Sequence, residues 1–144
     1  SFEAAIVTRE EPEFLPEGVR LVRATPNSPE LMDLYRWADL FVLPTKAECF
    51  GIATVEAMAS GLPVVVTNVG GATDIVEDGA TGWLIETGDA ALQLALDQAL
   101  AHRNDLPAMG QRGRRRAEEK FDGARNDRVI VDWLLELAES GRSV

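Results

Sequence analysis

The sequence predicts an α/β fold built on a parallel sheet. Short apolar runs alternate with helical segments along most of the chain, and the residues after about position 88 read as helix alone. Two of the apolar runs, "LFVL" at residues 40–43 and "PVVV" at residues 63–66, are apolar at consecutive positions, as parallel strands buried on both faces are. We therefore expect a Rossmann-like parallel sheet with helices on both faces and a helical C-terminal tail.

The pattern also places the individual elements. Strands are expected at residues 2–7, 19–22, 40–43, 64–67 and 83–85. Ser28 and Pro29 suit the N-cap and first position of a helix. Asp89 is expected to cap a second helix, and a third is expected from about residue 105 to 120. The last helix carries an apolar stripe of Val129, Ile130, Trp133, Leu134 and Leu137.

Length and composition limit what the chain can be. Its 144 residues, 46% of them hydrophobic, suit one globular domain with a core, at residues 1–144. No apolar run has the length of a membrane span, and the first residues lack the pattern of a secretory signal. A single cysteine, Cys49, excludes an internal disulfide and fits a reducing, cytoplasmic setting. Cys49 and the single His102 make no zinc pattern, so no metal is expected.

The charge balance bears on the partners. Fourteen Lys and Arg against 24 Asp and Glu give a net charge of −10, which argues against a nucleic-acid surface. The run "RGRRRAEEK" at residues 112–120 is expected to be a solvated helix face with charge pairs within the helix. An anionic ligand would then be held by local dipoles or by residues outside this chain.

The stretch "ECFGIATVE", residues 48–56, has acids at its two ends and no other charge. If a helix opens at Phe50 or Gly51, Glu56 falls within the apolar stripe that includes Ile52, and the helix should be covered on most sides. Eight helical residues rise ~12 Å, more than the about 5 to 9.5 Å that separate a carboxylate pair cleaving one glycosidic bond. The two acids could instead bracket an extended ligand with an anion between them, such as a nucleoside diphosphate sugar.

Two loops follow predicted strands and should open on the same edge of the sheet, where ligands of open parallel sheets bind. In the first loop, backbone N–H groups freed near Gly51 could face an anion. An alternative is a capping box between Thr45 and Glu48. In the second loop, Gly70 and Gly71 resemble an anion-binding turn, although a turn that needs positive φ explains them as well.

The segment "PTKAECFGIATVEAMASGLPVVVTNVGGATDIVEDGATGWLI", residues 44–85, resembles the donor-binding half of the retaining glycosyltransferases of GT-B fold, in the large family that includes sucrose and mannosyl transferases. The shared signature is Glu, seven residues and Glu, then "EAMASGLPVV", a Gly-Gly turn and "DGATGWL". The flanking segments also look like this family, so the resemblance covers essentially the whole chain.

The resemblance implies roles for individual residues. Glu56 would bind the ribose hydroxyls of a nucleoside diphosphate sugar donor, and Glu48, the candidate catalytic residue, would lie near the transferred sugar. The backbone at Phe50, Gly51 and Ile52 would meet the sugar and the diphosphate. Residues 24–31 match loosely a segment that contacts the base. Members transfer the sugar to an acceptor hydroxyl with retention, usually without a metal, and no cofactor is implied.

Cys49 is a further candidate beside Glu48, but an incidental position is the simpler interpretation because no base is near it in the sequence. Three alternatives to a transferase remain. One is a noncatalytic ligand-binding or interaction module on the same fold, and a second is sugar-nucleotide hydrolysis or epimerisation on a similar fold. The third, a dinucleotide-dependent oxidoreductase, is disfavoured because no G-x-G-x-x-G follows a strand.

In the family, another strand and a loop with an Arg and a Lys-Gly precede the segment matched here, and an N-terminal domain holds the acceptor. The resemblance therefore implies a chain truncated at its N-terminus and inactive alone. It also predicts that the absent strand would lie between the strands at residues 2–7 and 64–67. Both should then have open edges, and the chain is expected to self-associate, to rearrange its strands or to need a companion segment that supplies the missing strand.

Overall fold

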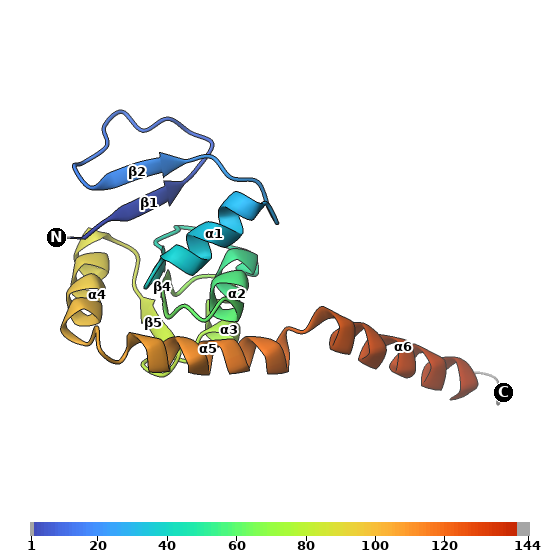
Figure 1. Ribbon diagram of the computed structural model, residues 1–144. Helices are drawn as coiled ribbons and strands as arrows, with labels where there is room; N and C mark the ends of the chain where they lie inside the picture. The colour runs from blue at the N-terminus through green and yellow to red at the C-terminus, as the bar shows by residue number, and fades with distance from the viewer. Residues whose placement is uncertain (1, 141–144) are drawn as a thin grey trace. The chain divides into compact units, whose positions relative to one another are not determined.

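The computed structural model describes residues 2–140, which form two compact units, one up to Ala38 and one from Asp39 onward. The first unit contains β1 (Ala4–Val7), β2 (Val19–Val22) and α1 (Pro29–Trp37) (Figure 1). The two strands pair in parallel, with Ala4 opposite Val19. Ser28 caps α1 as predicted, because its Oγ accepts a hydrogen bond of 3.2 Å from the N–H of Leu31.

The second unit contains three parallel strands and five helices within the described residues. The strands are β3 (Phe41–Leu43), β4 (Val64–Thr67) and β5 (Gly82–Ile85). The helices are α2 (Ile52–Ala59), α3 (Ala72–Ile75), α4 (Asp89–Ala101), α5 (Leu106–Lys120) and α6 (Gly123–Ser140). The strand order is β3-β4-β5. The α/β fold with a parallel sheet and a helical C-terminal segment is confirmed.

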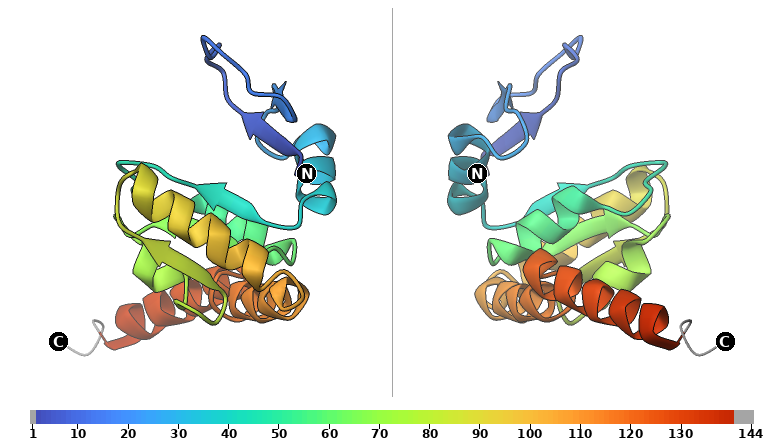
Figure 2. Two further views of the ribbon diagram at one scale, coloured as in Figure 1. Left: turned by 90° about the vertical axis from the view of Figure 1, so that its left-hand side faces the viewer. Right: turned by 90° about the vertical axis from the view of Figure 1, so that its right-hand side faces the viewer.

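The helices of the second unit cover both faces of its sheet (Figure 2). On one face, Ala95 of α4 packs with Val65 and Ile85 of the strands. On the other face, α2 and α5 approach each other closely, since a Cβ on Gly110 would lie 1.9 Å from the carbonyl oxygen of Gly61. Met58 of α2 is fully buried there. Packing on both faces therefore holds the strands of this sheet, from whose ends the candidate loops begin.

The strand predictions were correct for β4 and only partly correct for β3. All four residues of β4 are buried, as the run "VVVT" predicts. Residues Phe41, Val42 and Leu43 of β3 are only half-buried, because β3 pairs with β4 alone among the described strands. The prediction of an open edge at residues 64–67 was wrong, since β4 pairs on both sides. Among the described residues, the edge strands of this sheet are β3 and β5.

One helix prediction needed correction. Helix α4 begins at Asp89, but its N-cap is Gly88, so the prediction of Asp89 as the cap was wrong by one residue. The apolar stripe of α6 leaves its side chains half exposed or more, for example Trp133 at 62% and Ile130 at 55%. None of the helices among the described residues is long and apolar enough to cross a bilayer.

Candidate functional site

The first loop, residues 44–51, follows β3, and we call it the Glu48 loop. It does not begin as a helix: Thr45 Oγ1 accepts from the N–H of Ala47 at 3.3 Å and donates to the Ala47 carbonyl oxygen at 2.7 Å. Glu48 Oε1 accepts a 2.9 Å hydrogen bond from the N–H of Cys49. The capping box between Thr45 and Glu48 is therefore absent, because helix α2 starts only at Ile52.

Gly51 turns the chain into helix α2. It is the N-cap, with φ of 93° and ψ of 46°, a left-handed conformation that glycine adopts without a steric penalty. No side chain caps α2. The N–H of Thr54 donates to the Gly51 carbonyl oxygen at 3.0 Å, so the N–H groups of Ile52 and Ala53 are the ones that face solvent or a ligand. Since residues 48–51 are not helical, the ~12 Å rise expected for eight helical residues does not apply to the span from Glu48 to Glu56.

Helix α2 is not covered in the way its sequence suggested. Thr54, Ala57 and Met58 are the buried residues. Ile52, expected in the apolar stripe, is 67% exposed, whereas Glu56 is half-buried. The helix therefore packs through the face that carries Thr54, and it leaves its N-terminal apolar residue accessible beside Gly51.

The second loop, residues 68–71, follows β4, and we call it the glycine turn. Gly70 has φ of 56°, and the N–H of Gly71 donates to the carbonyl oxygen of Cys49 at 3.1 Å. A Cβ on Gly70 would lie 2.0 Å from the carbonyl oxygen of Glu48. The backbone of the glycine turn therefore packs against the backbone of the Glu48 loop. Because the N–H of Gly71 is bonded to Cys49, it is not available to an anion.

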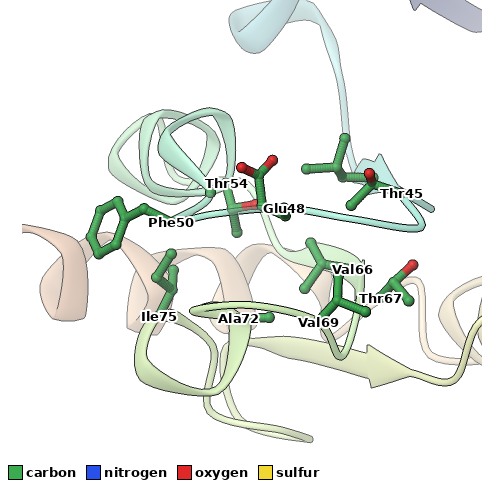
Figure 3. Close-up of a pocket in the computed structure, with 11 residues that line it drawn as sticks. Thr45, Glu48, Phe50, Thr54, Val66, Thr67, Val69, Ala72 and Ile75 are labelled. Atoms are coloured by element: carbon green, nitrogen blue, oxygen red, sulfur yellow. The ribbon is translucent and has the colours of Figure 1, made fainter.

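The two loops meet at the carboxyl ends of β3 and β4, as the sequence predicted. Between them lies a hollow of about 10 Å³ (Figure 3). Glu48, Thr45 and Phe50 of the first loop line it, together with Thr67 and Val69 from the end of β4 and the chain after it. A space of that size holds about one water molecule. Any larger ligand must therefore lie on the exposed surface above the hollow rather than inside it.

Cys49 and Phe50, two further predicted site residues, belong to the Glu48 loop. Cys49 is exposed, and its N–H donates to Glu48. The single histidine, His102, is the C-cap residue of α4, and its Nδ1 lies 3.6 Å from Asp105 Oδ2. Phe50 is 44% exposed. Its partner Phe121, which follows α5, carries no local sequence signal that would have placed it beside the loop. Within residues 2–140, no three His, Cys, Asp or Glu side chains are grouped to hold a metal ion.

The parallel sheet thus carries, at its carboxyl edge, an acidic loop and a helix start without a side-chain cap. Residues 10–116 match the model of the family described as glycosyl transferases group 1. The chain therefore belongs to the group 1 glycosyl transferases, and its fold corresponds to one of the two Rossmann-like halves of their GT-B architecture.

Similar proteins are consistent with this assignment. N-acetyl-alpha-D-glucosaminyl L-malate synthase of Bacillus anthracis is 38% identical over 107 residues, which are 70% of this chain and 26% of that protein. Sucrose-phosphate synthase from Thermosynechococcus elongatus superposes with a TM-score of 0.76 at 29% identity, over 86% of this chain and 31% of that one. Anabaena Alr3699/HepE in complex with UDP and glucose gives 0.72 at 27% identity, over 83% and 32%. The chain thus spans about a quarter to a third of these proteins.

Proposed function

We propose that this chain is the donor-binding half of a glycosyltransferase that moves a sugar from a nucleoside diphosphate sugar to an acceptor hydroxyl with retention. The observation that carries the proposal is the meeting of the Glu48 loop, the uncapped start of α2 and the glycine turn at one edge of the sheet. The similar Anabaena protein was solved with UDP and glucose, which indicates the class of ligand.

The chemistry of the site suits such a donor. The start of α2 offers N–H groups and the positive end of the helix dipole to a diphosphate, and Gly51 lets the ligand approach the backbone. Carboxylates accept hydrogen bonds from vicinal hydroxyls, so Glu56 would bind the ribose and Glu48 the transferred sugar. Cys49 belongs to the Glu48 loop and Gly70 lies against it, so the backbone atoms of both residues would be close to the bound donor.

The small hollow supports a role as one half of a larger site. At about 10 Å³ it encloses no part of a nucleotide sugar, and ligand pockets usually bury most of their ligand. The opposite wall and the acceptor would then come from a second domain of the parent enzyme. In the same way, cations for the diphosphate would come from residues outside this chain.

Calorimetry on the parent enzyme with a panel of UDP, GDP and ADP sugars tests the proposal. Glu56→Gln should weaken the preferred donor by about 1 to 3 kcal/mol, the usual range for a hydrogen bond to a charged group. Asp97→Asn makes the same charge change on exposed α4 and should leave affinity unchanged. Equal affinity in wild type and Glu56→Gln would remove Glu56 from the site. NMR of the product's anomeric proton tests retention.

A further inference from the structure

A second groove lies away from the Glu48 loop, between α5 and the turn at residues 77–81. Its volume is about 270 Å³. This is far larger than the hollow of about 10 Å³ beside Glu48 and leaves room for a small anion. The turn precedes β5, so the groove lies toward the amino end of that strand rather than at the carboxyl edge that carries the proposed donor site. We call it the Arg groove; its charged residues are Glu77, Arg112, Arg115, Arg116, Glu119 and Lys120.

Two guanidinium groups of the Arg groove are held in place by backbone carbonyls. Arg112 Nε donates to the carbonyl oxygen of Ala80 at 2.7 Å. Arg116 donates from Nε to Ile75 at 2.6 Å and from Nη2 to Asp74 at 3.0 Å. A guanidinium has five N–H donors, so these bonds orient the group and leave donors unused. Arg114 pairs with Glu118 at 2.8 Å, as expected for a solvated helix face with internal charge pairs, whereas Arg112 and Arg116 reach carbonyl oxygens outside the helix.

Two more cations border the groove without a partner. Within residues 2–140, the side chains of Arg115 and Lys120 make no hydrogen bond or ion pair, and both are exposed. The acids of the groove are Glu77, whose Oε2 lies 3.8 Å from Arg116 Nη1, and Glu119. Four cations therefore face two carboxylates, a local excess of positive charge on a chain whose net charge is −10.

We propose that the Arg groove binds a free phosphate-bearing anion, a phosphate or diphosphate group. Phosphate oxygens accept paired N–H bonds from a fixed guanidinium fork, which Arg112 offers through its two Nη atoms. Arg115 and Lys120 supply the net charge that a dianion requires. Glu77 and Glu119 at the same groove oppose a broad anionic surface, so the structure favours a small soluble anion over a lipid membrane.

Titration of the chain with inorganic diphosphate at constant ionic strength tests the proposal. We expect one saturable site by calorimetry, with a shift of the Arg112 Nε–H resonance in NMR spectra. Arg115→Ala/Lys120→Ala should weaken binding at least tenfold. Arg103→Ala/Arg114→Ala removes the same charge outside the groove and should change affinity less than twofold. An unchanged urea midpoint shows that each variant folds.

Three results would overturn the proposal. The first is the absence of saturable binding to the wild-type chain. The second is equal weakening in the two double variants, which would reduce the effect to general charge. The third concerns vesicles of phosphatidylcholine with phosphatidic acid, with which the chain should not sediment. Sedimentation that Arg115→Ala/Lys120→Ala abolishes would assign the groove to a lipid headgroup and not to a free anion.

Discussion

The ring of Phe50 meets the ring of Phe121 edge to face, with centroids 5.8 Å apart and an interplanar angle of 78°. Phe50 belongs to the Glu48 loop, and Phe121 stands between α5 and α6. The contact therefore joins two segments separated by seventy residues of sequence, from Gly51 to Lys120. It makes the position of the Glu48 loop depend on the place where α5 ends and α6 begins.

A double-mutant cycle measures this dependence. Phe50→Leu and Phe121→Leu keep apolar groups at both positions but remove the ring pair, which is worth about 0.5–1.5 kcal/mol beyond buried area. We expect a coupling energy in that range from urea unfolding. Phe14 is 77% exposed and serves as the control, since Phe50→Leu and Phe14→Leu should be additive. Additivity in the Phe50 and Phe121 cycle would mean that the contact contributes nothing to folding.

The glycine turn gives a second prediction. Gly70→Ala adds a Cβ 2.0 Å from the carbonyl oxygen of Glu48, at a φ of 56°. Gly79→Ala is the matched control, because Gly79 also has positive φ, 73°, but no atom lies within 4 Å of its added Cβ. The steric difference should make Gly70→Ala the more destabilising by about 1–3 kcal/mol in urea unfolding. Equal losses would show that only the backbone conformation matters.

Local signals made much of the fold predictable. Ser28 and Pro29 mark the start of α1, and the uninterrupted apolar run of β4 marks a strand buried on both faces. The half-exposed edge position of β3 was not predictable from "LFVL", because the number of neighbours a strand has is decided by distant parts of the chain. The pairing of β4 with both β3 and β5 is information of this kind.

At the site, the sequence indicated the right loops but not their conformation. The sequence suggested a helix that opens at Phe50 or Gly51, close to the observed start at Ile52. The left-handed conformation of Gly51, which makes the estimated rise from Glu48 to Glu56 inapplicable, was not predictable from the spacing of the two acids. The contacts that position the arginines of the Arg groove were also not predictable from the sequence. Arg116 reaches a carbonyl oxygen on Ile75, 41 positions away, and no periodicity within "RGRRRAEEK" reports such a contact.

Glu48→Gln in the parent enzyme gives a third prediction. Glutamine keeps a side-chain oxygen that can accept the N–H of Cys49, so the loop should retain its conformation while the negative charge is lost. Because its proposed contact is with the transferred sugar, turnover should fall by a larger factor than nucleoside diphosphate affinity. Steady-state kinetics and calorimetry measure the two quantities. A collapse of nucleotide affinity with unchanged turnover would reverse the roles of Glu48 and Glu56.

The fourth prediction is that the chain of 144 residues catalyses no glycosyl transfer by itself. Transfer needs donor and acceptor held in attack geometry, and the hollow of about 10 Å³ encloses neither. Incubation of the purified chain with donor sugars and a broad acceptor panel, with product detection by mass spectrometry, checks this. The parent enzyme under the same conditions is the positive control. Robust product from the chain alone would refute the proposal that it is half of the catalytic unit.

The fifth prediction is that the isolated chain self-associates through α6. Val129, Ile130, Trp133 and Leu134 are 55–62% exposed on one helix, whereas soluble monomers rarely expose large contiguous apolar patches. Burial of apolar surface yields about 25 cal/mol per Å², so pairing of two such stripes should be favourable. Sedimentation velocity over a range of concentrations should show a concentration-dependent increase in mass.

Matched substitutions distinguish self-association through α6 from self-association through the open edge of β3. Ile130→Glu/Leu134→Glu places charges in the stripe of α6 and should leave the chain monomeric. Leu94→Glu/Leu100→Glu changes two leucines of α4 with similar exposure, 61% and 58%, and should leave association intact. If association persists in Ile130→Glu/Leu134→Glu, the stripe is not the interface. Protection of residues 41–43 from amide exchange only in the associated form would then assign the interface to β3, because an edge strand offers unpaired backbone groups to a second chain.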